Sequence, residues 1–240
     1  MQIKKAIIVG ATSGIGRQMA ILLADKNYMI GITGRRKNLL EELKRQRPDS
    51  FIVSDFDITE TFAVTKKLDE LAAKLGKVDL LILSSGTGEI NEQLDFNVEK
   101  KTLDVNVVGF TEVANWTINY FLQQHEGHFV AITSIAGLRG SWQAPAYNST
   151  KAFQINYIEG LRQKVTKSKL PIYITDIRPG FVNTPMAKGN GKFWVATVEK
   201  AAKQIFNSIE SKKSVAYITK RWRIIAIIIR LLPREIYRRM

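Results

Sequence analysis

The feature that most constrains the fold is a regular alternation of short apolar runs with longer segments of helical periodicity. The runs that we expect to form strands are Lys5–Val9, Tyr28–Thr33, Phe51–Ser54, Asp79–Leu83, His128–Thr133, Ile172–Ile177 and Ser214–Ile218. Helical spacing of apolar residues covers 14–26, 37–46, 60–75, 97–123, 145–168 and 197–210. Most of the runs are almost continuously apolar, which is typical of strands buried on both faces of a parallel sheet. The alternation therefore predicts the α/β class, with a doubly wound parallel sheet of about seven strands and helices on both faces.

Composition narrows the class of protein further. The 240 residues are 45% hydrophobic and 24% charged, a balance that excludes a disordered chain or a polytopic membrane protein. The absence of cysteine excludes a disulfide framework and thiolate metal sites, and it fits a reducing compartment. The apolar start of the chain ends in a glycine loop rather than a cleavage site, so we expect a cytoplasmic protein. We expect one domain over residues 1–220 and a separate tail over 221–240.

The loop after the first predicted strand has the composition of a phosphate-binding turn. Gly10, Gly14 and Gly16 lie between that strand and the next helical segment. Glycine lets a pyrophosphate approach the backbone, and the helix N-terminus offers N–H groups and partial positive charge. This context favours a Rossmann-type dinucleotide site over a glycine-rich turn without a ligand. The residues that we expect to hold the dinucleotide here are Gly10, Thr12, Ser13, Gly14, Ile15 and Gly16.

The end of the second predicted strand indicates which dinucleotide is bound. An acidic residue at this point would take the adenosine ribose hydroxyls and select NAD, whereas arginine accommodates a 2′-phosphate. The chain has Arg35 and Arg36 and no acid there, so it predicts NADP. The competing interpretation is a solvated cationic helix start. After the third strand, Asp57 and Ile58 are candidates for contact with the adenine.

Four further side chains form the most specific constellation. Tyr147 and Lys151 are four residues apart in a helical segment, so they share one helix face. Ser134 follows the fifth predicted strand, and Asn106 lies in the helical segment 97–123. With the glycine loop and the stretch Pro179–Thr184, this set resembles the short-chain dehydrogenase/reductase family in its short single-domain branch. The resemblance covers about residues 4–218.

The resemblance implies an oxidoreductase that interconverts a carbonyl and a secondary alcohol. Tyr147 would be the general acid/base, and Ser134 would donate a hydrogen bond to the substrate oxygen. Lys151 would hold the nicotinamide ribose and, aided by the positive ring of the oxidised nicotinamide, lower the pKa of the phenol, since one cation at ~4 Å supplies about 4 kcal/mol at an effective dielectric of ~20. Asn106 would fix a water that links Lys151 to solvent. The remaining cofactor contacts would come from Ser85, Gly86, Pro179, Gly180, Val182 and Thr184.

One motif departs from the family pattern. Most relatives have Asn-Asn-Ala-Gly after the fourth strand, whereas this chain has Leu83-Ser84-Ser85-Gly86. Gly86 still permits close approach of the cofactor, but serine makes fewer and shorter hydrogen bonds than asparagine. We therefore expect cofactor binding to persist with altered local geometry.

The charge of the chain is concentrated at its end. The net charge is +14, and residues Lys212–Met240 hold nine Lys or Arg against one acid, which leaves +6 for the remaining 211 residues. This distribution predicts a basic tail rather than a nucleic-acid-binding face. Between Arg221 and Pro233 the tail is a short isoleucine-rich helix that places Arg223, Arg230 and Arg234 on one side. It would contact a membrane surface peripherally, or else cover the active site or another subunit.

These observations support one function and leave two alternatives. We expect an NADP-dependent enzyme with a small, apolar carbonyl or alcohol substrate and no nucleic-acid partner. By the resemblance, segments 97–123 and 145–168 would form the subunit contact of a homodimer or homotetramer. The alternatives are a non-catalytic NADP(H) sensor or scaffold, and a module that binds membranes or nucleic acid through the tail. His125 and His128 have no nearby carboxylate or cysteine partner, so they predict a solvated turn rather than a metal site.

Overall fold

The sheet has the architecture that the alternation predicts. The computed structural model describes residues 3–187 and 193–239, and within them the strands form one parallel sheet of order β3-β2-β1-β4-β5-β6-β7. This is a doubly wound Rossmann-type sheet, and the predicted fold class is confirmed. The strands are β1 (Lys5–Val9), β2 (Met29–Gly34), β3 (Phe51–Asp55), β4 (Leu80–Leu83), β5 (Gly127–Ile132), β6 (Ile172–Pro179) and β7 (Val215–Ile218).

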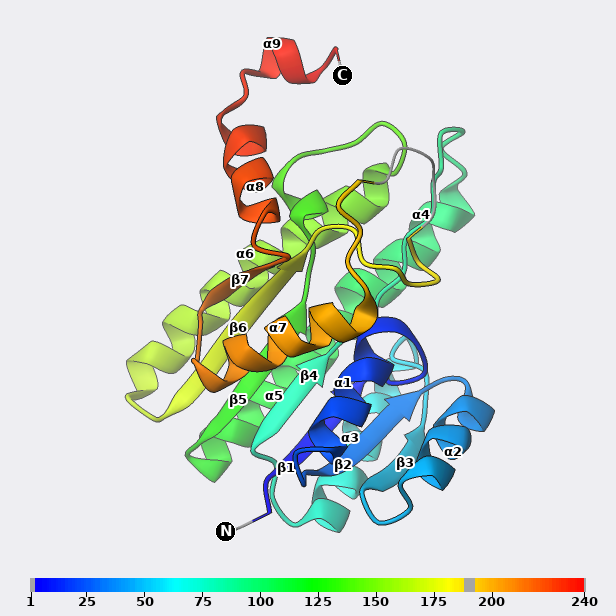
Figure 1. Ribbon diagram of the computed structural model, residues 1–240, viewed down its shortest axis with the longest axis vertical. Helices are drawn as coiled ribbons and strands as arrows, with labels where there is room; N and C mark the ends of the chain where they lie inside the picture. Colours follow the sequence, from blue (N-terminus) through cyan, green and yellow to red (C-terminus); the bar gives the residue numbers. More distant parts are fainter. Residues whose placement is uncertain (1–2, 188–192, 240) are drawn as a thin grey trace.

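Helices cover both faces of the sheet, as Figure 1 shows. One face carries α1 (Gly14–Ala24), α2 (Lys37–Gln46) and α7 (Val198–Glu210). The other carries α3 (Thr61–Leu75), α5 (Phe110–Gln124) and α6 (Pro145–Ser168). Shorter elements follow the strand ends and the last strand: α4 (Phe96–Leu103), the π-helical turn η1 (Asp104–Gly109), the 3-10 turn η2 (Ile135–Leu138), α8 (Trp222–Leu231) and α9 (Arg234–Tyr237).

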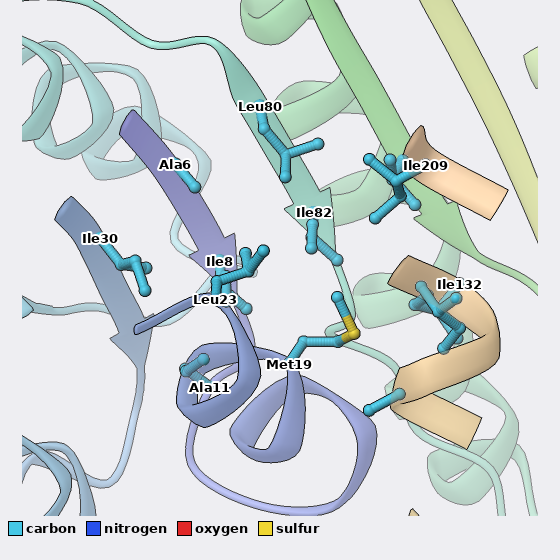
Figure 2. Packing of buried hydrophobic residues seen from close by; sticks show 14 of the residues in the cluster. Ala6, Ile8, Ala11, Met19, Leu23, Ile30, Leu80, Ile82, Ile132 and Ile209 are labelled. Carbon is cyan, nitrogen blue, oxygen red and sulfur yellow. The ribbon is translucent and has the colours of Figure 1, made fainter. Parts of the chain in front are cut away.

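Two hydrophobic cores result from the alternation of side chains along each strand. Ala6 and Ile8 of β1 pack into the core under α1, α2 and α7, whereas Ile7 and Val9 pack into the opposite core. Figure 2 shows the first core, where Met19 of α1 lies among side chains of the central strands. Because both faces are covered, the strands read as continuous apolar runs in the sequence.

The strand order reverses between β1 and β4, and this positions the site. From β1 the chain proceeds to β2 on one side, and from β4 to β5 on the other. Ligands of such sheets bind in the crevice beyond the carboxyl ends of the strands at this switch point. The glycine loop follows β1, the Ser84–Gly88 loop follows β4, and Ser134 lies just beyond β5.

Two local details differ from the sequence prediction. The continuous helix predicted over 97–123 is divided into α4 and α5 by the π-helical turn η1. Pro233 ends α8 as predicted, but Arg234 belongs to α9 and therefore does not share a helix with Arg223 and Arg230. Among residues 3–187 and 193–239, no helix combines the length and hydropathy needed to cross a bilayer.

Candidate active site

The glycine loop brings three segments into close backbone contact. Gly10 has φ +95°, and a Cβ there would lie 2.6 Å from the Ser85 nitrogen. A Cβ on Gly16 would lie 2.1 Å from the Gly10 carbonyl oxygen. Larger residues would force these segments apart, so glycine is required by both conformation and space. The loop therefore lies directly against the start of the β4 loop.

The start of α1 is suited to hold an anion. Its N-cap residue, Ser13, makes no side-chain cap hydrogen bond, and the first turn contains no acidic residue. The first N–H groups of a helix have no partner within the helix, and the helix dipole adds partial positive charge there. A phosphate at this position would meet backbone donors and no competing carboxylate.

The two predicted arginines lie beside this loop. Arg36 donates to the hydroxyl oxygens of Thr12 at 2.5 Å and Ser13 at 2.8 Å. Arg35 pairs with the carboxylate of Asp57 at 3.2 Å. Partial burial opposes ionisation of Asp57, but hydrogen bonds from Thr59 and the charge of Arg35 outweigh it and lower its pKa. Both residues remain exposed after the end of β2.

Backbone hydrogen bonds hold the unusual serine loop that follows β4. The Ser84 and Ser85 nitrogens both donate to the Val9 carbonyl, at 2.8 and 2.9 Å. A Cβ on Gly86 would lie 3.4 Å from both the Asn106 amide oxygen and the Lys151 ammonium nitrogen. The predicted residues Ser85 and Gly86 thus lie between the glycine loop and the catalytic candidates.

Asn106 joins the π-helical turn to the loop after Gly86. Its side-chain oxygen accepts from the Thr87 nitrogen at 2.9 Å, and its amide donates to the Thr87 carbonyl at 2.6 Å and to the Thr150 hydroxyl at 3.1 Å. Asn106 is fully buried. These contacts use both ends of the amide, which explains why an asparagine stands in the core of an apolar segment.

Lys151 is buried in a network of neutral acceptors. Its ammonium donates to the Ile132 carbonyl at 3.2 Å and to the side-chain oxygen of Gln154 at 2.9 Å. The amide of Gln154 in turn donates to the Asn106 carbonyl at 2.9 Å. Burial lowers the pKa of Lys151 to about 8, although the negative charge of Asp176 opposes this shift. A side-chain amide thus links the Asn106 carbonyl to Lys151. The water that the sequence predicts between Lys151 and solvent stays a prediction.

Tyr147 lies on the same side of α6 as Lys151. The Lys151 nitrogen is 5.8 Å from the centre of the Tyr147 ring, and a Cβ on Gly88 would lie only 2.3 Å from that ring. Burial raises the pKa of the Tyr147 phenol, and a hydrogen bond with Ser134 opposes the rise. In the protein by itself, removal from water disfavours the phenolate more than its neighbours favour it. The lowered pKa expected from Lys151 together with the oxidised nicotinamide ring stays a prediction.

Ser134 is the N-cap residue of η2 and keeps its proton available. Its hydroxyl oxygen accepts from the Ala136 nitrogen at 3.1 Å. A hydroxyl has one donor and two acceptor positions, so this bond leaves the O–H able to donate. Asn148 holds the following turn by donating to the Ala136 and Arg139 carbonyls at 2.9 and 2.8 Å.

The stretch after β6 closes the other side of the crevice. The Gly180 nitrogen donates to the Ile218 carbonyl at 2.7 Å, and Val182 is buried beside Ala196. A Cβ on Gly14 would lie 3.2 Å from the Thr184 methyl group, so this stretch contacts the glycine loop. Pro179 is the last residue of β6. The segment Pro185–Val195, where the family resemblance implies a short substrate lid, includes residues 188–192, which lie outside the described residues.

Sequence reasoning missed several residues of this site. Gln154, Thr87 and Gly88 contact the predicted side chains, and Trp222 packs against Gly180. Gln154 was the one that a pattern could have found, since a polar residue on the buried side of α6, three positions after Lys151, needs an internal partner. The solvated turn predicted for the two histidines is wrong for His128, which is buried in β5, within the predicted strand, 2.8 Å from the Thr175 hydroxyl.

Comparisons with known proteins agree with this geometry. Residues 4–193 match the family model described as short chain dehydrogenase. The chain belongs to the short-chain dehydrogenase family. It is 30% identical over 193 residues to an uncharacterized oxidoreductase of Staphylococcus saprophyticus, covering 78% of this chain and 82% of that one. Its general activity is thus that of an oxidoreductase of this family acting on CH–OH or C=O groups.

Solved structures of this dehydrogenase family share its fold. A short chain dehydrogenase of Burkholderia cenocepacia in complex with NADP superimposes with a TM-score of 0.84 at 18% identity, covering 100% of this chain and 98% of that one. A family member of Burkholderia phymatum in complex with NAD gives a TM-score of 0.84 at 20% identity, covering 95% and 92%. At these identities the likeness establishes the fold alone.

Proposed function

We propose that this dehydrogenase uses NADP to interconvert a carbonyl and a secondary alcohol, with Tyr147 as general acid/base. The observation that carries the proposal is the meeting of Ser134, Tyr147, Lys151 and Asn106 beyond the carboxyl ends of β4 and β5. They come from three separate segments of the chain, η1, the turn after β5 and α6. A sensor that only binds a dinucleotide has no need for a proton donor beside an ammonium group.

The residues present fit a nicotinamide dinucleotide. Gly10, Gly14 and Gly16 of the loop carry no side chain that would fill the approach to the backbone, and a Cβ at Gly10 or Gly16 would collide with neighbouring backbone. The pyrophosphate would lie at the start of α1, and Gly86, Val182 and Thr184 would border the nicotinamide half. When bound, the dinucleotide supplies a hydride to the carbonyl carbon or accepts one from the alcohol carbon.

Each side chain then has a separate task in proton transfer. In the direction of reduction, the Tyr147 hydroxyl donates its proton to the oxygen of the forming alkoxide, and in oxidation it takes the proton back. Ser134 donates a hydrogen bond to the same oxygen, where negative charge develops. Lys151 has three N–H donors, two of which meet Ile132 and Gln154, so the third can face the phenolate and the ribose.

Arg36 supports NADP as the preferred dinucleotide. It already bonds the Thr12 and Ser13 hydroxyls at the edge of the glycine loop, where it can also reach a 2′-phosphate. The similar structures hold NAD in one case and NADP in another, so the preference of this chain depends on its own arginines. A guanidinium forms strong, paired hydrogen bonds with phosphate.

We propose further that the protein is a homodimer or homotetramer through α5 and α6. Phe153 of α6 is partly exposed and stacks on Tyr157 at 5.5 Å, and Val108 and Leu103 expose apolar side chains on neighbouring turns. A cavity of about 750 Å³ borders α5 on its outer side and includes Trp116 and Tyr120. Such aromatic surfaces are enriched in subunit contacts.

Oxidation of NADPH in the presence of a carbonyl panel tests the reaction. The panel holds ketones, 3-oxoacyl thioesters, sugars and steroids, and each is assayed with NADPH and with NADH. We expect turnover of at least one class, apolar rather than sugar-like, with faster turnover on NADPH. Tight NADPH binding without turnover of any class would favour the sensor, and faster turnover on NADH would contradict the role given to the arginines.

A further inference from the structure

The C-terminal helix α8 exposes an apolar stripe on the side that faces away from the body. Its buried residues are Trp222 and Ala226, which lie on one face. At 3.6 residues per turn, the opposite face carries Ile224, Ile227, Ile228 and Leu231. These side chains are 61%, 50%, 51% and 77% exposed. A helix that is apolar on both faces is normally covered on both, so the outer stripe of α8 lacks a partner within the described chain.

Arginines surround this stripe and almost no acid balances them. Arg223 and Arg230 lie on the flank of α8 between its buried and outer faces, and both are exposed. Arg221 precedes the helix, and Arg234, Arg238 and Arg239 follow it, with Glu235 as the one acid from 221 to 239. Exposed isoleucine and leucine flanked by arginine is the pattern of helices that lie in anionic lipid surfaces.

Specific contacts fix α8 and α9 to the loops that border the site. Trp222 packs on Phe181 and Phe193, with ring centres 5.5 and 4.9 Å apart. A Cβ on Gly180 would lie 2.1 Å from the Trp222 ring, so α8 is in direct contact with the stretch that closes the crevice. Farther on, Arg139 donates to the Leu232 carbonyl at 3.1 Å.

The α9 helix is attached to the turn that precedes Tyr147. The Tyr237 hydroxyl donates to the Gly140 carbonyl at 2.5 Å, and the Arg139 guanidinium lies 4.5 Å from the centre of the Tyr237 ring. Figure 1 shows α8 and α9 at the end of the molecule opposite the N-terminus, where they extend beyond the sheet. The direction of the tail is thus fixed by contacts with two loops of the site, the stretch after β6 and the turn that precedes Tyr147.

Other exposed apolar side chains lie on the same two site loops. Trp142, in the turn bound by α9, is 65% exposed. Phe193 and Trp194 contact Trp222 and also remain partly exposed. The outer stripe of α8, the turn with Trp142 and the pair Phe193 and Trp194 belong to segments that are far apart in the sequence. Contacts of the tail bring these segments together. We call Trp142, Phe193, Trp194 and the outer stripe of α8 the apolar rim.

We propose that the apolar rim and the tail arginines dock this protein on an anionic lipid bilayer, with the crevice end toward the lipid. The bilayer would receive the outer stripe of α8 at the level of the headgroups, and the arginines would meet lipid phosphates. The docking itself is independent of the reaction. That the docked end is the catalytic one rests on the proposed function.

A second copy of the chain fits this surface less well than a bilayer. A two-fold contact brings the same patch of both copies together. Arg223 and Arg230 would then face their own equivalents, with Glu235 alone to offset them, and like charges in apposition disfavour association. An anionic bilayer offers negative charge and an apolar interior together.

Sedimentation of the full chain with vesicles tests the docking. Vesicles of phosphatidylglycerol mixed with phosphatidylcholine are compared with vesicles of phosphatidylcholine alone, without dinucleotide or substrate. We expect the wild type to bind the anionic vesicles and to be released by high salt. The double variant Ile227→Ser/Ile228→Ser should lower the partition coefficient about tenfold or more, since both side chains are half exposed and would enter the lipid. The matched control is Ile3→Ser, an isoleucine 55% exposed at the other end of the chain, which should bind as the wild type does.

Quenching of tryptophan fluorescence by brominated lipid tests the orientation. We expect quenching on anionic vesicles, and a smaller quenched fraction in Trp142→Phe. The docking is contradicted by equal partition of the wild type and the double variant, or by absence of vesicle binding. If the double variant instead abolishes a larger assembly seen by size exclusion, the rim joins copies of the chain and the proposal is wrong. NADPH oxidation in the absence of vesicles is measured separately, so failure of docking is distinct from failure of the proposed reaction.

Discussion

At the scale of single residues, the state of Lys151 depends on how its buried charge is satisfied. Its acceptors are a carbonyl and an amide oxygen, both neutral, and burial lowers its pKa to about 8. Hydrogen bonds to the charged form favour that form. In the proposed mechanism, Gln154 would therefore act on proton transfer through Lys151, as a positioning residue.

The variant Gln154→Leu should move the pH profile of the reductase. Leucine removes the acceptor at 2.9 Å, so the charged form of Lys151 loses support and its pKa falls further. Since the proposed activity needs the ammonium form of Lys151, we expect the basic limb of the kcat/KM profile to shift to lower pH. At pH 8, kcat/KM should fall about tenfold. Gln154→Glu, whose carboxylate favours the ammonium, should move the limb to higher pH. A uniform loss in Gln154→Leu with an unmoved limb would show a merely structural role.

The variant Arg36→Ala should weaken NADPH binding selectively. A charge-assisted hydrogen bond contributes about 1.5–3 kcal/mol, which corresponds to a Kd raised by about tenfold or more. The Kd for NADH should change little, because NADH lacks the 2′-phosphate. Fluorescence titration with both dinucleotides measures the two constants, and Arg17→Ala, which removes an arginine paired with Glu42, is the control. An equal rise for NADH would contradict phosphate recognition by Arg36.

At the scale of elements, the strands and most helices follow from the sequence, whereas the π-helical turn does not. Apolar runs and helical spacing reflect local burial, and they place β1, α2 and α6 at the bounds that the structure shows. The turn η1 depends on the Asn106 amide meeting Thr87, which lies 19 residues away in the chain. Periodicity contains no information on such a contact.

The same limit applies to the site. Spacing along α6 was enough to bring Tyr147 and Lys151 to one face, because helix geometry is local. The raised pKa of Tyr147 and the link through Gln154 depend on packing between distant segments. The sequence therefore predicts candidate reacting groups but not the environment that sets their protonation.

His128 makes the β5–β6 pairing sensitive to acid. Burial, with a smaller contribution from the charge of Lys212, lowers its pKa to about 4. The unfolded chain binds a proton near pH 6.5 and the folded one does not, so stability falls as the pH drops between those values. We expect the free energy of unfolding to fall by about 2 kcal/mol from pH 7 to pH 5 through this residue alone.

Urea denaturation of His128→Gln checks this expectation. Glutamine can still bond the Thr175 hydroxyl but does not titrate, so the difference in stability between pH 7 and pH 5 should shrink by that amount. His125→Gln replaces the exposed histidine after α5 and serves as the control. An unchanged pH dependence in His128→Gln would show that another group is responsible.

At the scale of the whole molecule, the apolar surfaces divide into two. One is the apolar rim at the crevice end, and the other is the aromatic surface of α5 and α6 around Phe153. The two lie on different elements, so assembly between copies and docking on lipid do not compete for the same residues.

The variant Phe153→Arg should dissociate the proposed oligomer. A charge at each copy of this position would face its equivalent across a two-fold contact, which disfavours association. Light scattering coupled to size exclusion should show the mass of one chain for the variant and a multiple of it for the wild type. Phe62→Arg, at a fully exposed phenylalanine of α3, should keep the wild-type mass. A wild type with the mass of one chain would contradict the oligomer.

The most direct test of the account measures turnover and NADPH affinity on the same preparation of Tyr147→Phe. Removing the hydroxyl takes away the proton donor but leaves the ring that packs against Gly88. We predict that kcat falls by about a hundredfold to ten-thousandfold while the Kd for NADPH stays within about twofold of the wild type. Turnover close to that of the wild type would contradict the account, because the proton would then come from a group other than Tyr147.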